Sequence, residues 1–284
     1  MLNTRLHQKN GSFTIDAIID QTNQRIWVSN YNFSNAPEFT DFLIQNAYQN
    51  SADKVIIPAR DNDVGALENQ GFVLEGRAEG FFNGDTAYFM SAYPSAKRRQ
   101  SINLKNKMDQ LQKIISMPLK PSNKLPEGYI VRNAVPDDAK ALAILYDKVF
   151  STYPTPLNDS EYIQKLMNND TYFLLIEYNG DIASAAAAEI DAENGNAEMT
   201  NCATNPEHQG KGLMSILMND LENMVLKKDI KCLYSLSRSS EFGINLIFHR
   251  LGYSYCGTLI NNCHICNTWE DMHLWVKTKF SPIS

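Results

Sequence analysis

The segment 209–212, which reads Gln-Gly-Lys-Gly, constrains the fold of this chain more than any other feature. A strand pattern ends just before it at Thr204, and an amphipathic helical pattern begins just after it at Leu213. Glycines in such a turn let backbone N–H groups crowd around an anion, and the positive end of the helix dipole lies at the same place. The segment therefore predicts a site for a phosphate or pyrophosphate group. Its spacing fits neither a Walker A loop nor a dinucleotide-binding fingerprint.

Strand and helix patterns alternate on both sides of this turn. Apolar patterns and turn residues predict strands at 129–131, 172–177, 182–190, 198–204, 232–236, 253–260 and 272–278. Apolar residues at every third or fourth position predict helices at about 137–149, 162–167, 213–225 and 243–251. The interleaving of the two kinds predicts an α/β fold with a mixed sheet.

Proline content marks the domain boundary. Pro118, Pro121 and Pro126 lie close together among few large apolar residues, and proline cannot continue a helix. We therefore predict three segments: an N-terminal α/β domain at 1–117, a linker at 118–127 and a C-terminal domain at 128–284.

A weak internal repeat links the two domains. Gly252 stands 181 positions after Gly71, and Gly257 stands the same distance after Gly76. We interpret the N-terminal domain as a degenerate copy of the second half of the C-terminal one, with chance similarity of turn chemistry as the alternative. No glycine occurs in 30–38, where the copied phosphate turn would fall. We therefore expect one cofactor site per chain.

Composition narrows the classes of partner. A net charge of −6 at pH 7 argues against the basic surface that nucleic acid requires, so we expect a small-molecule partner. We interpret the one basic run, at 97–107, as the solvated face of a connecting helix. No stretch approaches the roughly 20 apolar residues that span a bilayer, and the polar start lacks a secretory pattern. We expect a cytoplasmic protein with no membrane contact.

The five cysteines of a chain without an export signal are expected to be thiols. Cys263, His264 and Cys266 look like half of a zinc site, but no second pair completes it. We therefore expect no metal.

The strand, the turn and the helix together resemble the GNAT superfamily of N-acetyltransferases. Its phosphate loop reads Gln/Arg-x-x-Gly-x-Gly/Ala after a Pro-Glu pair, here Pro206 and Glu207. Residues 209–214 fit this loop except at the last place, where Met214 replaces a small residue. The resemblance covers 128–284 and implies the acyl-CoA N-acyltransferase fold with acetyl-CoA as co-substrate. The N-terminal domain then looks like a degenerate half of the same fold.

The resemblance also implies which residues hold acetyl-CoA. Backbone groups of Cys202, Ala203 and Thr204 would bind the pantetheine arm in the manner of an added strand. The loop and the start of the helix would contribute Gln209, Gly210, Lys211, Gly212, Leu213, Met214 and Ser215. Phe248 on the later helix is also assigned to the cofactor site.

Phe248 departs from the pattern of the superfamily. It stands where many relatives carry the tyrosine that protonates the departing thiolate, and it has no proton to give. The general acid therefore stays open between Tyr253, Tyr255 and solvent. The same residue supports an alternative function, a regulatory acyl-CoA-binding domain that has lost catalysis.

Acetyl transfer to an amine requires a base or a desolvating pocket. An alkyl amine with a pKa near 10.4 is neutral in only about one of 10³ to 10⁴ molecules at pH 7. Glu198 is our candidate base, because strand alternation predicts that it shares a face with Thr200, Cys202 and Thr204. A solvent-facing strand carboxylate is the alternative.

Further segments resemble the β-lysine N-acetyltransferase family, in which methionine after Gly-Leu is usual. They are Thr200-Asn201-Cys202-Ala203-Thr204, Leu251-Gly252-Tyr253, Asn261-Asn262, Glu270-Asp271-Met272 and the loop of Tyr153-Pro154. The resemblance implies acetylation of the side-chain amine of β-lysine to Nε-acetyl-β-lysine, a zwitterionic compatible solute. Another small amine, such as lysine or a polyamine, is the alternative substrate. The sequence does not determine the oligomeric state.

A zwitterionic substrate requires an anion reader and a cation reader at opposite ends of its pocket. We predict that Arg238 pairs with the carboxylate and that Glu270 or Glu198 holds the β-ammonium. Neutral hydrogen bonds and pocket contacts are predicted for Tyr153, Asn201, Asn261 and Asn262. For each asparagine, a role in a turn is the alternative.

Overall fold

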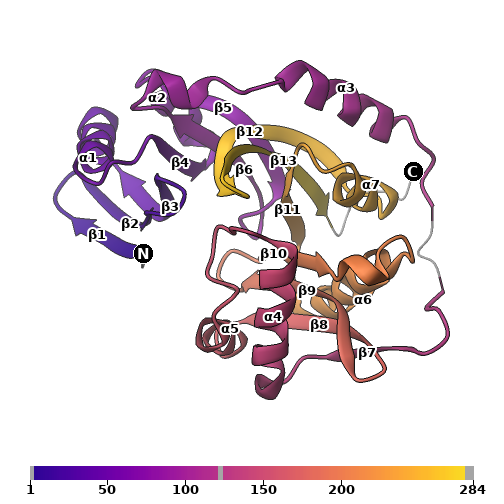
Figure 1. The fold of residues 1–284 in the computed structure, drawn as a ribbon. Helices are drawn as coiled ribbons and strands as arrows, with labels where there is room; N and C mark the ends of the chain where they lie inside the picture. Colours follow the sequence, from indigo (N-terminus) through magenta and orange to yellow (C-terminus); the bar gives the residue numbers. More distant parts are fainter. Residues whose placement is uncertain (1–2, 121–123, 279–284) are drawn as a thin grey trace.

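The computed structural model describes residues 3–120 and 124–278 of the chain. Within these residues one mixed sheet of 13 strands runs through both halves of the molecule (Figure 1). Its strand order is β1-β2-β3-β4-β6-β5-β12-β13-β11-β10-β9-β8-β7. Pro121 of the predicted linker lies outside the described residues. No helix in the described part is long and apolar enough to cross a membrane.

The N-terminal half supplies the first six strands and three helices. Their bounds are β1 (Thr4–Lys9), β2 (Phe13–Asp20), β3 (Arg25–Phe33), α1 (Ala36–Gln49), β4 (Lys54–Ala59), α2 (Val64–Glu68), β5 (Val73–Gly80), β6 (Gly84–Ala92) and α3 (Leu104–Ile115).

The C-terminal half contains every element that the sequence predicts after residue 128, within a few residues at each end. The bounds are β7 (Tyr129–Asn133), α4 (Ala139–Val149), α5 (Ser160–Met167), β8 (Thr171–Tyr178), β9 (Asp181–Asp191), β10 (Asn196–Thr204), α6 (Leu213–Val225), β11 (Cys232–Arg238), α7 (Phe242–Arg250), β12 (Ser254–Ile265) and β13 (Thr268–Thr278). The predicted α/β fold with a mixed sheet is confirmed.

Alanines in β9 explain how helices cover both faces of this sheet. Ala186 and Ala188 pack in the core beneath α6, whereas Ala185 and Ala187 pack in the core beneath α4. Alternate residues of a strand point to opposite faces, and small side chains let a helix approach closely from either side. Glycine is avoided, so the strand keeps its backbone stiffness.

The sequence suggested that the basic run in 97–107 is the solvated face of a helix, but two of its side chains make buried contacts. Arg98 is buried, and its guanidinium lies 3.2 Å from the ring centroid of Trp269. Lys107 on α3 pairs with the buried carboxylate of Asp271 at 2.8 Å. A buried arginine needs hydrogen-bond acceptors, and the carbonyls of Asn23 and Asn261 provide them. The run therefore ties the two halves together.

The strand order of the N-terminal half repeats that of the C-terminal half. The series β1-β2-β3-β4-β6-β5 has the order of β8-β9-β10-β11-β13-β12, and β3–β4 is parallel just as β10–β11 is. The likeness therefore extends beyond the second half of the C-terminal domain to which the sequence repeat pointed. Only β7, α4 and α5 have no counterpart among the described N-terminal elements.

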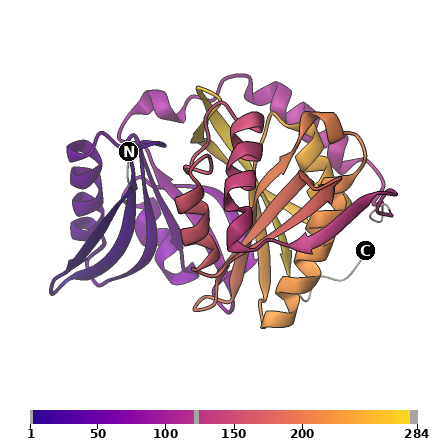
Figure 2. The same ribbon diagram turned by 60° about the horizontal axis from the view of Figure 1, so that its bottom comes forward.

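The two halves join where the repeated glycines meet. Gly76 on β5 pairs with Gly257 on β12 in an antiparallel bridge (Figure 2 shows the halves side by side). A Cβ atom on Gly257 would lie 2.2 Å from the carbonyl oxygen of Glu75. Next to the bridge, the buried Lys54 pairs with Glu75 at 2.7 Å and donates to the carbonyl of Ile260 at 2.8 Å. The joint is therefore a close backbone contact with satisfied buried charges.

Replacing Gly257 with Ala is expected to lower the free energy of unfolding by about 2–4 kcal/mol, because the new methyl group overlaps backbone atoms and the positive φ of 148° disfavours a side chain. Chemical denaturation measures the change. Gly65→Ala is the control, since Gly65 is helical with no atom within 4 Å of an added Cβ, and we expect about 0.4–1 kcal/mol of stabilisation there. Equal stability of Gly257→Ala and wild type would contradict the close contact.

Candidate active site

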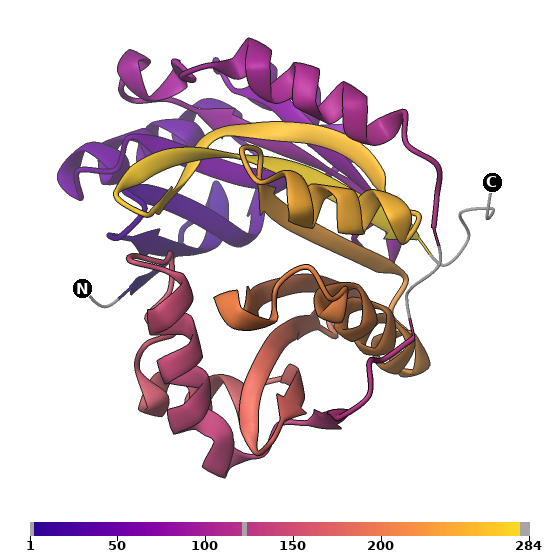
Figure 3. The same cartoon turned by 45° about the vertical axis from the view of Figure 1, so that its right-hand side comes forward.

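Strands β10 and β11 pair in parallel over only three residues each. The paired residues run from Asn196 to Glu198 on β10 and from Cys232 to Tyr234 on β11. Beyond them the strands diverge, and in Figure 3 the C-terminal half separates into one group with α7 and another with α4 and α6. The opening forms a cavity of about 710 Å³. Unpaired backbone groups of β10 thus face a space large enough for an extended ligand arm.

A β-bulge at Asn201 shapes the β10 side of this cavity. The register with β9 shifts between Thr200 and Ala203, and Asn201 has a φ of 53°. The carbonyl of Asn201 accepts the buried Tyr146 hydroxyl at 2.7 Å, and its side chain donates to Glu189 at 3.3 Å. The extra residue holds the strand away from a regular ladder.

The bulge corrects the predicted alternation along β10. Glu198 and Thr200 share a face, but beyond the bulge Ala203 continues that face and packs beneath α4. Cys202 packs on the opposite face, where its Sγ lies 3.6 Å from Met218 Sδ of α6. Thr204, two residues after Cys202, lies on the same face of the strand as Cys202. The prediction that Glu198, Cys202 and Thr204 share one face is therefore wrong, because one extra residue reverses the period of two.

The helix α6 begins with an open N-terminus. Gly210 and Gly212 both have a φ of 76°, and no side chain among the described residues caps the helix. The first N–H groups of a helix have no intrahelical partner, so these donors are free for an anion. The residues of this turn and helix start that line the cavity are Gln209, Gly210, Gly212, Leu213, Met214 and Ser215. Lys211 points elsewhere and donates to the carbonyl of Glu207 at 3.0 Å.

The corresponding turn of the N-terminal half is closed. Only two residues, Ser34 and Asn35, connect β3 to α1, and Asn35 accepts from the backbone N–H of Glu38 at 3.3 Å. The Tyr31 hydroxyl bridges from β3 to the segment after β4, donating to Asp63 at 2.7 Å and accepting from the N–H of Arg60 at 3.0 Å. The ring of Tyr31 stacks on Phe33 and on Phe39, and these two rings also stack on each other. Side chains of the N-terminal half itself therefore cap α1 and bridge the ends of its strands.

The tyrosines proposed as the general acid do not line the cavity. Phe248 is fully buried on the cavity wall and packs edge-on against Tyr253, with 5.2 Å between ring centroids. Tyr255 bonds to Thr258 at 2.7 Å. Among the described residues on the cavity wall, Tyr153 is the tyrosine, and burial raises its pKa so that the hydroxyl stays protonated at neutral pH.

A pair of carboxylates lies on the face of β10 that α4 and α5 flank. Glu198 is directly opposite Glu189 of β9, and both side chains are partly buried. Burial, reinforced by the neighbouring Glu189, raises the pKa of Glu198 to about 8, and burial also raises the pKa of Glu189. The hydroxyl of Tyr234 lies 3.4 Å from Glu198. Sequence reasoning missed Glu189, although the short turn at 192–195 sets the register that pairs the two.

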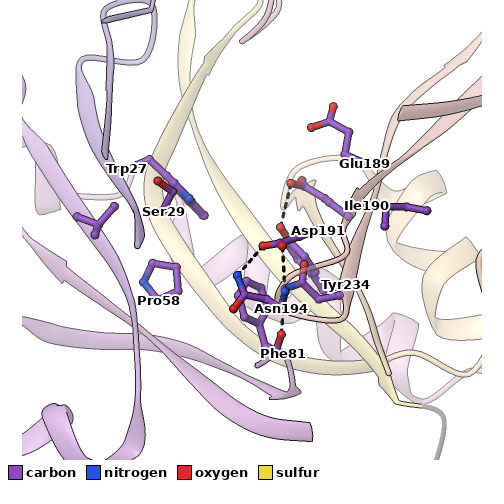
Figure 4. Close-up of a pocket in the computed structure, with 12 residues that line it drawn as sticks. Trp27, Ser29, Pro58, Phe81, Glu189, Ile190, Asp191, Asn194 and Tyr234 are labelled. Carbon is purple, nitrogen blue, oxygen red and sulfur yellow. Dashed lines mark hydrogen bonds between the residues drawn. The ribbon is translucent and has the colours of Figure 1, made fainter. Parts of the chain in front are cut away.

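A smaller pocket of about 240 Å³ extends from this pair into the junction of the two halves. Figure 4 shows Trp27, Ser29 and Pro58 of the N-terminal half on one side and Glu189, Asp191 and Tyr234 on the other. Glu198 also lines this pocket. The carboxylate pair therefore faces a space to which both halves contribute.

Several predicted substrate residues have structural partners instead. Arg238 lines the large cavity but pairs with Glu270 at 2.9 Å, so these two do not stand at opposite ends of a pocket as predicted. Asn261 is buried in a bulge of β12, where its side chain donates to the carbonyls of Arg98 and Gln100. Asn262 is fully buried. Neither asparagine lines the cavity, whereas Tyr153 and Asn201 do.

Comparison with known proteins agrees with this geometry. The model of the acetyltransferase (GNAT) family matches residues 140–253. The chain is 36% identical to the N-acetyltransferase YodP of Bacillus subtilis, over 93% of this chain and 96% of that protein. Its identity to the β-lysine N(6)-acetyltransferase of Methanococcus maripaludis is 35%, and to that of Methanosarcina mazei 36%. Each of these alignments covers 79% of this chain, with 82% and 90% of the respective relatives.

The chain therefore belongs to the acetyltransferase (GNAT) family, and it is an N-acetyltransferase. The divergent parallel strands and the uncapped helix are the features of the site that fit this class. The match extends through the N-terminal half, which the family model does not cover.

Replacing Gly212 with Val is expected to weaken acetyl-CoA binding at least tenfold, because the side chain enters the space of the phosphates and strains a residue with positive φ. Equilibrium dialysis measures the affinity. Gly252→Val is the matched control: it has a similar φ of 83° and no atom within 4 Å of an added Cβ, but it lies outside the cavity. Unchanged affinity in folded Gly212→Val would refute the phosphate site.

The carboxylate pair predicts a pH dependence of stability. The pKa of Glu198 is raised above its unfolded value, so the native state holds more protons than the unfolded state between about pH 4.5 and 8. The free energy of unfolding therefore falls as pH rises through this window. Glu198→Gln should flatten the fall between about pH 4.5 and 8, and Glu193→Gln, an exposed control on the same hairpin, should not. If the free energy of unfolding depends on pH in the same way for wild type and Glu198→Gln, Glu198 has no raised pKa.

Proposed function

We propose that this enzyme transfers the acetyl group of acetyl-CoA to the side-chain amine of β-lysine. The observation that carries the proposal is the course of β10, which holds Glu198 opposite Glu189 of β9 and then, beyond the bulge, forms one wall of the cavity at the uncapped start of α6. The names of the relatives from Methanococcus maripaludis and Methanosarcina mazei support the choice of amine.

The proposed acetyl-CoA site uses backbone groups more than charged side chains. Free N–H groups from Gly210 to Leu213 would take the pyrophosphate, and they carry the positive end of the α6 dipole. The unpaired edge of β10 at Asn201 to Thr204 would take the amides of the pantetheine arm. Phe248 would contact the ligand as an apolar wall, since its ring is buried on the cavity side.

The reaction requires a neutral amine beside the thioester. In the proposed step Glu198 accepts a proton from the ammonium, and the amine nitrogen attacks the thioester carbonyl carbon. The C–N bond forms and the C–S bond breaks. The attached nitrogen then loses a second proton to give the amide, and through Tyr153 or water this proton reaches the departing thiolate. A pKa of about 8 suits this role, because a base near the working pH both accepts and releases protons readily.

The product has a distinctive charge. β-Lysine carries two ammonium groups and one carboxylate, so acetylation of one amine leaves a zwitterion with no net charge. This property suits a compatible solute, which accumulates without counterions. The proposed location is the cytoplasm, where acetyl-CoA is available.

Glu198→Gln is expected to lower kcat by about 10² to 10⁴ at pH 7 with little change in the KM for acetyl-CoA. Coenzyme A thiol release is measured with β-lysine, α-lysine and 1,5-diaminopentane, and the product is mapped by NMR. The loss should shrink as rising pH deprotonates the free amine.

Glu193→Gln serves as the control and should retain wild-type kcat. A Glu198→Gln variant that only raises the KM for the amine would assign Glu198 to binding instead of proton transfer. Absence of thiol release from wild type with β-lysine, alongside release with another amine, would overturn the proposed substrate.

A further inference from the structure

The N-terminal half places a guanidinium group, that of Arg25, near enough to Glu198 for the two charges to interact. Arg25 and Trp27 lie on the same face of β3, two residues apart, and the Arg25 guanidinium carbon is 5.4 Å from the Trp27 ring centroid. Trp27 lines the pocket at the junction of the halves, opposite Glu189 and Glu198. The junction therefore brings a cation of one half toward the carboxylates of the other.

The hydrogen bonds of Arg25 leave one end of the guanidinium free. Its Nε donates to Asp20 at 3.0 Å. Its Nη1 donates to the carbonyl of Asn262 at 3.2 Å and lies 3.5 Å from Cys263 Sγ. Arginine has five N–H donors, and among the described residues none accepts from Nη2. These bonds fix the orientation of the group, so that Nη2 is held in place without a partner.

We propose that Nη2 of Arg25 binds the carboxylate of the amine substrate, which makes the N-terminal half part of the active site. The inference rests on the proposed function, because it concerns the recognition of an amino acid by the same site. The substrate would lie along the junction pocket, with its reacting amine at Glu198, its second ammonium at Glu189 and its carboxylate at Arg25.

The charges around Arg25 make it suitable for one anion. Asp20 forms its ion pair, and Lys54 and Arg98 are the nearby cations from β4 and the segment after β6. Lys54 is already paired with Glu75, and Arg98 donates to two carbonyls. Nη1 of Arg98 also lacks a partner, but that atom is buried, whereas Nη2 of Arg25 is not among the buried unpaired atoms and its guanidinium lies beside Trp27 of the pocket. An ammonium near Glu189 and a carboxylate near Arg25 together match a diamino acid better than a diamine.

This arrangement explains why the N-terminal half is retained although its own cofactor turn is closed. Its β3 supplies one wall of the pocket, and the Gly76–Gly257 bridge sets the position of that wall. A domain of the same family without this half would lack the group that reads the carboxylate. Arg238, the reader predicted from the sequence, is held by Glu270 and Glu241.

The test compares β-lysine with β-lysinamide, which has the same shape but no negative charge. Wild type should prefer β-lysine in kcat/KM, and Arg25→Gln should lower kcat/KM for β-lysine by about 10- to 100-fold while leaving that for β-lysinamide within threefold. The KM for acetyl-CoA should not change. Arg98→Gln is the matched control, because Arg98 also bridges the halves through carbonyls but packs on Trp269 instead of the pocket residue Trp27, and it should preserve the preference.

Two results would overturn this inference and leave the proposed function standing. An equal loss for β-lysine and β-lysinamide in Arg25→Gln would assign Arg25 to packing of the halves, and an unchanged kcat/KM for β-lysine would exclude it from binding. The wild-type reaction with β-lysine is measured first. No thiol release at that point would overturn the proposed function and this inference with it, so the two failures are distinct.

Discussion

The end of the parallel pairing between β10 and β11 determines the rest of the site. Past Glu198 and Tyr234 the two strands cannot hydrogen-bond to each other, and backbone groups in a protein interior need partners. The bulge at Asn201 keeps β10 open, and the glycine turn before α6 leaves the N–H groups of that helix unsatisfied. A ligand with amides and phosphates at the right separation satisfies both sets at once. The cavity is therefore a consequence of unmade backbone hydrogen bonds.

In the N-terminal half the same strand order occurs, but side chains of that half form hydrogen bonds at the ends of the strands and at the start of the helix. Its parallel pair β3–β4 also ends after three residues, yet Tyr31 crosses the gap and Asn35 caps the following helix. Two copies of one strand order thus have opposite roles. In our proposal one binds the cofactor and the other reads the substrate from across the Gly76–Gly257 bridge.

Local pattern predicted most of the fold and part of the site. The elements after residue 128, the glycine turn and the wall residues Tyr153, Asn201 and Phe248 follow from spacing and resemblance, and the structure places them together. Long-range partners could not be predicted. Nothing in the chain order indicates that Arg238 meets Glu270 or that Asn261 binds the segment at Arg98, and a single inserted residue at the bulge invalidated the alternation that we used for Cys202. The role of Glu189 follows only from the register of β9 with β10, which places it opposite Glu198.

The two copies differ in the turn before their first helix, and the stoichiometry of acetyl-CoA binding shows whether this difference leaves one cofactor site or two. Calorimetric titration of the full chain with acetyl-CoA counts the sites without relying on any substitution. The open turn at Gly210 and Gly212 and the closed turn at Asn35 predict one molecule bound per chain. Two molecules per chain would mean that the Tyr31 bridge opens and that the N-terminal half is a second cofactor site, which would contradict the account.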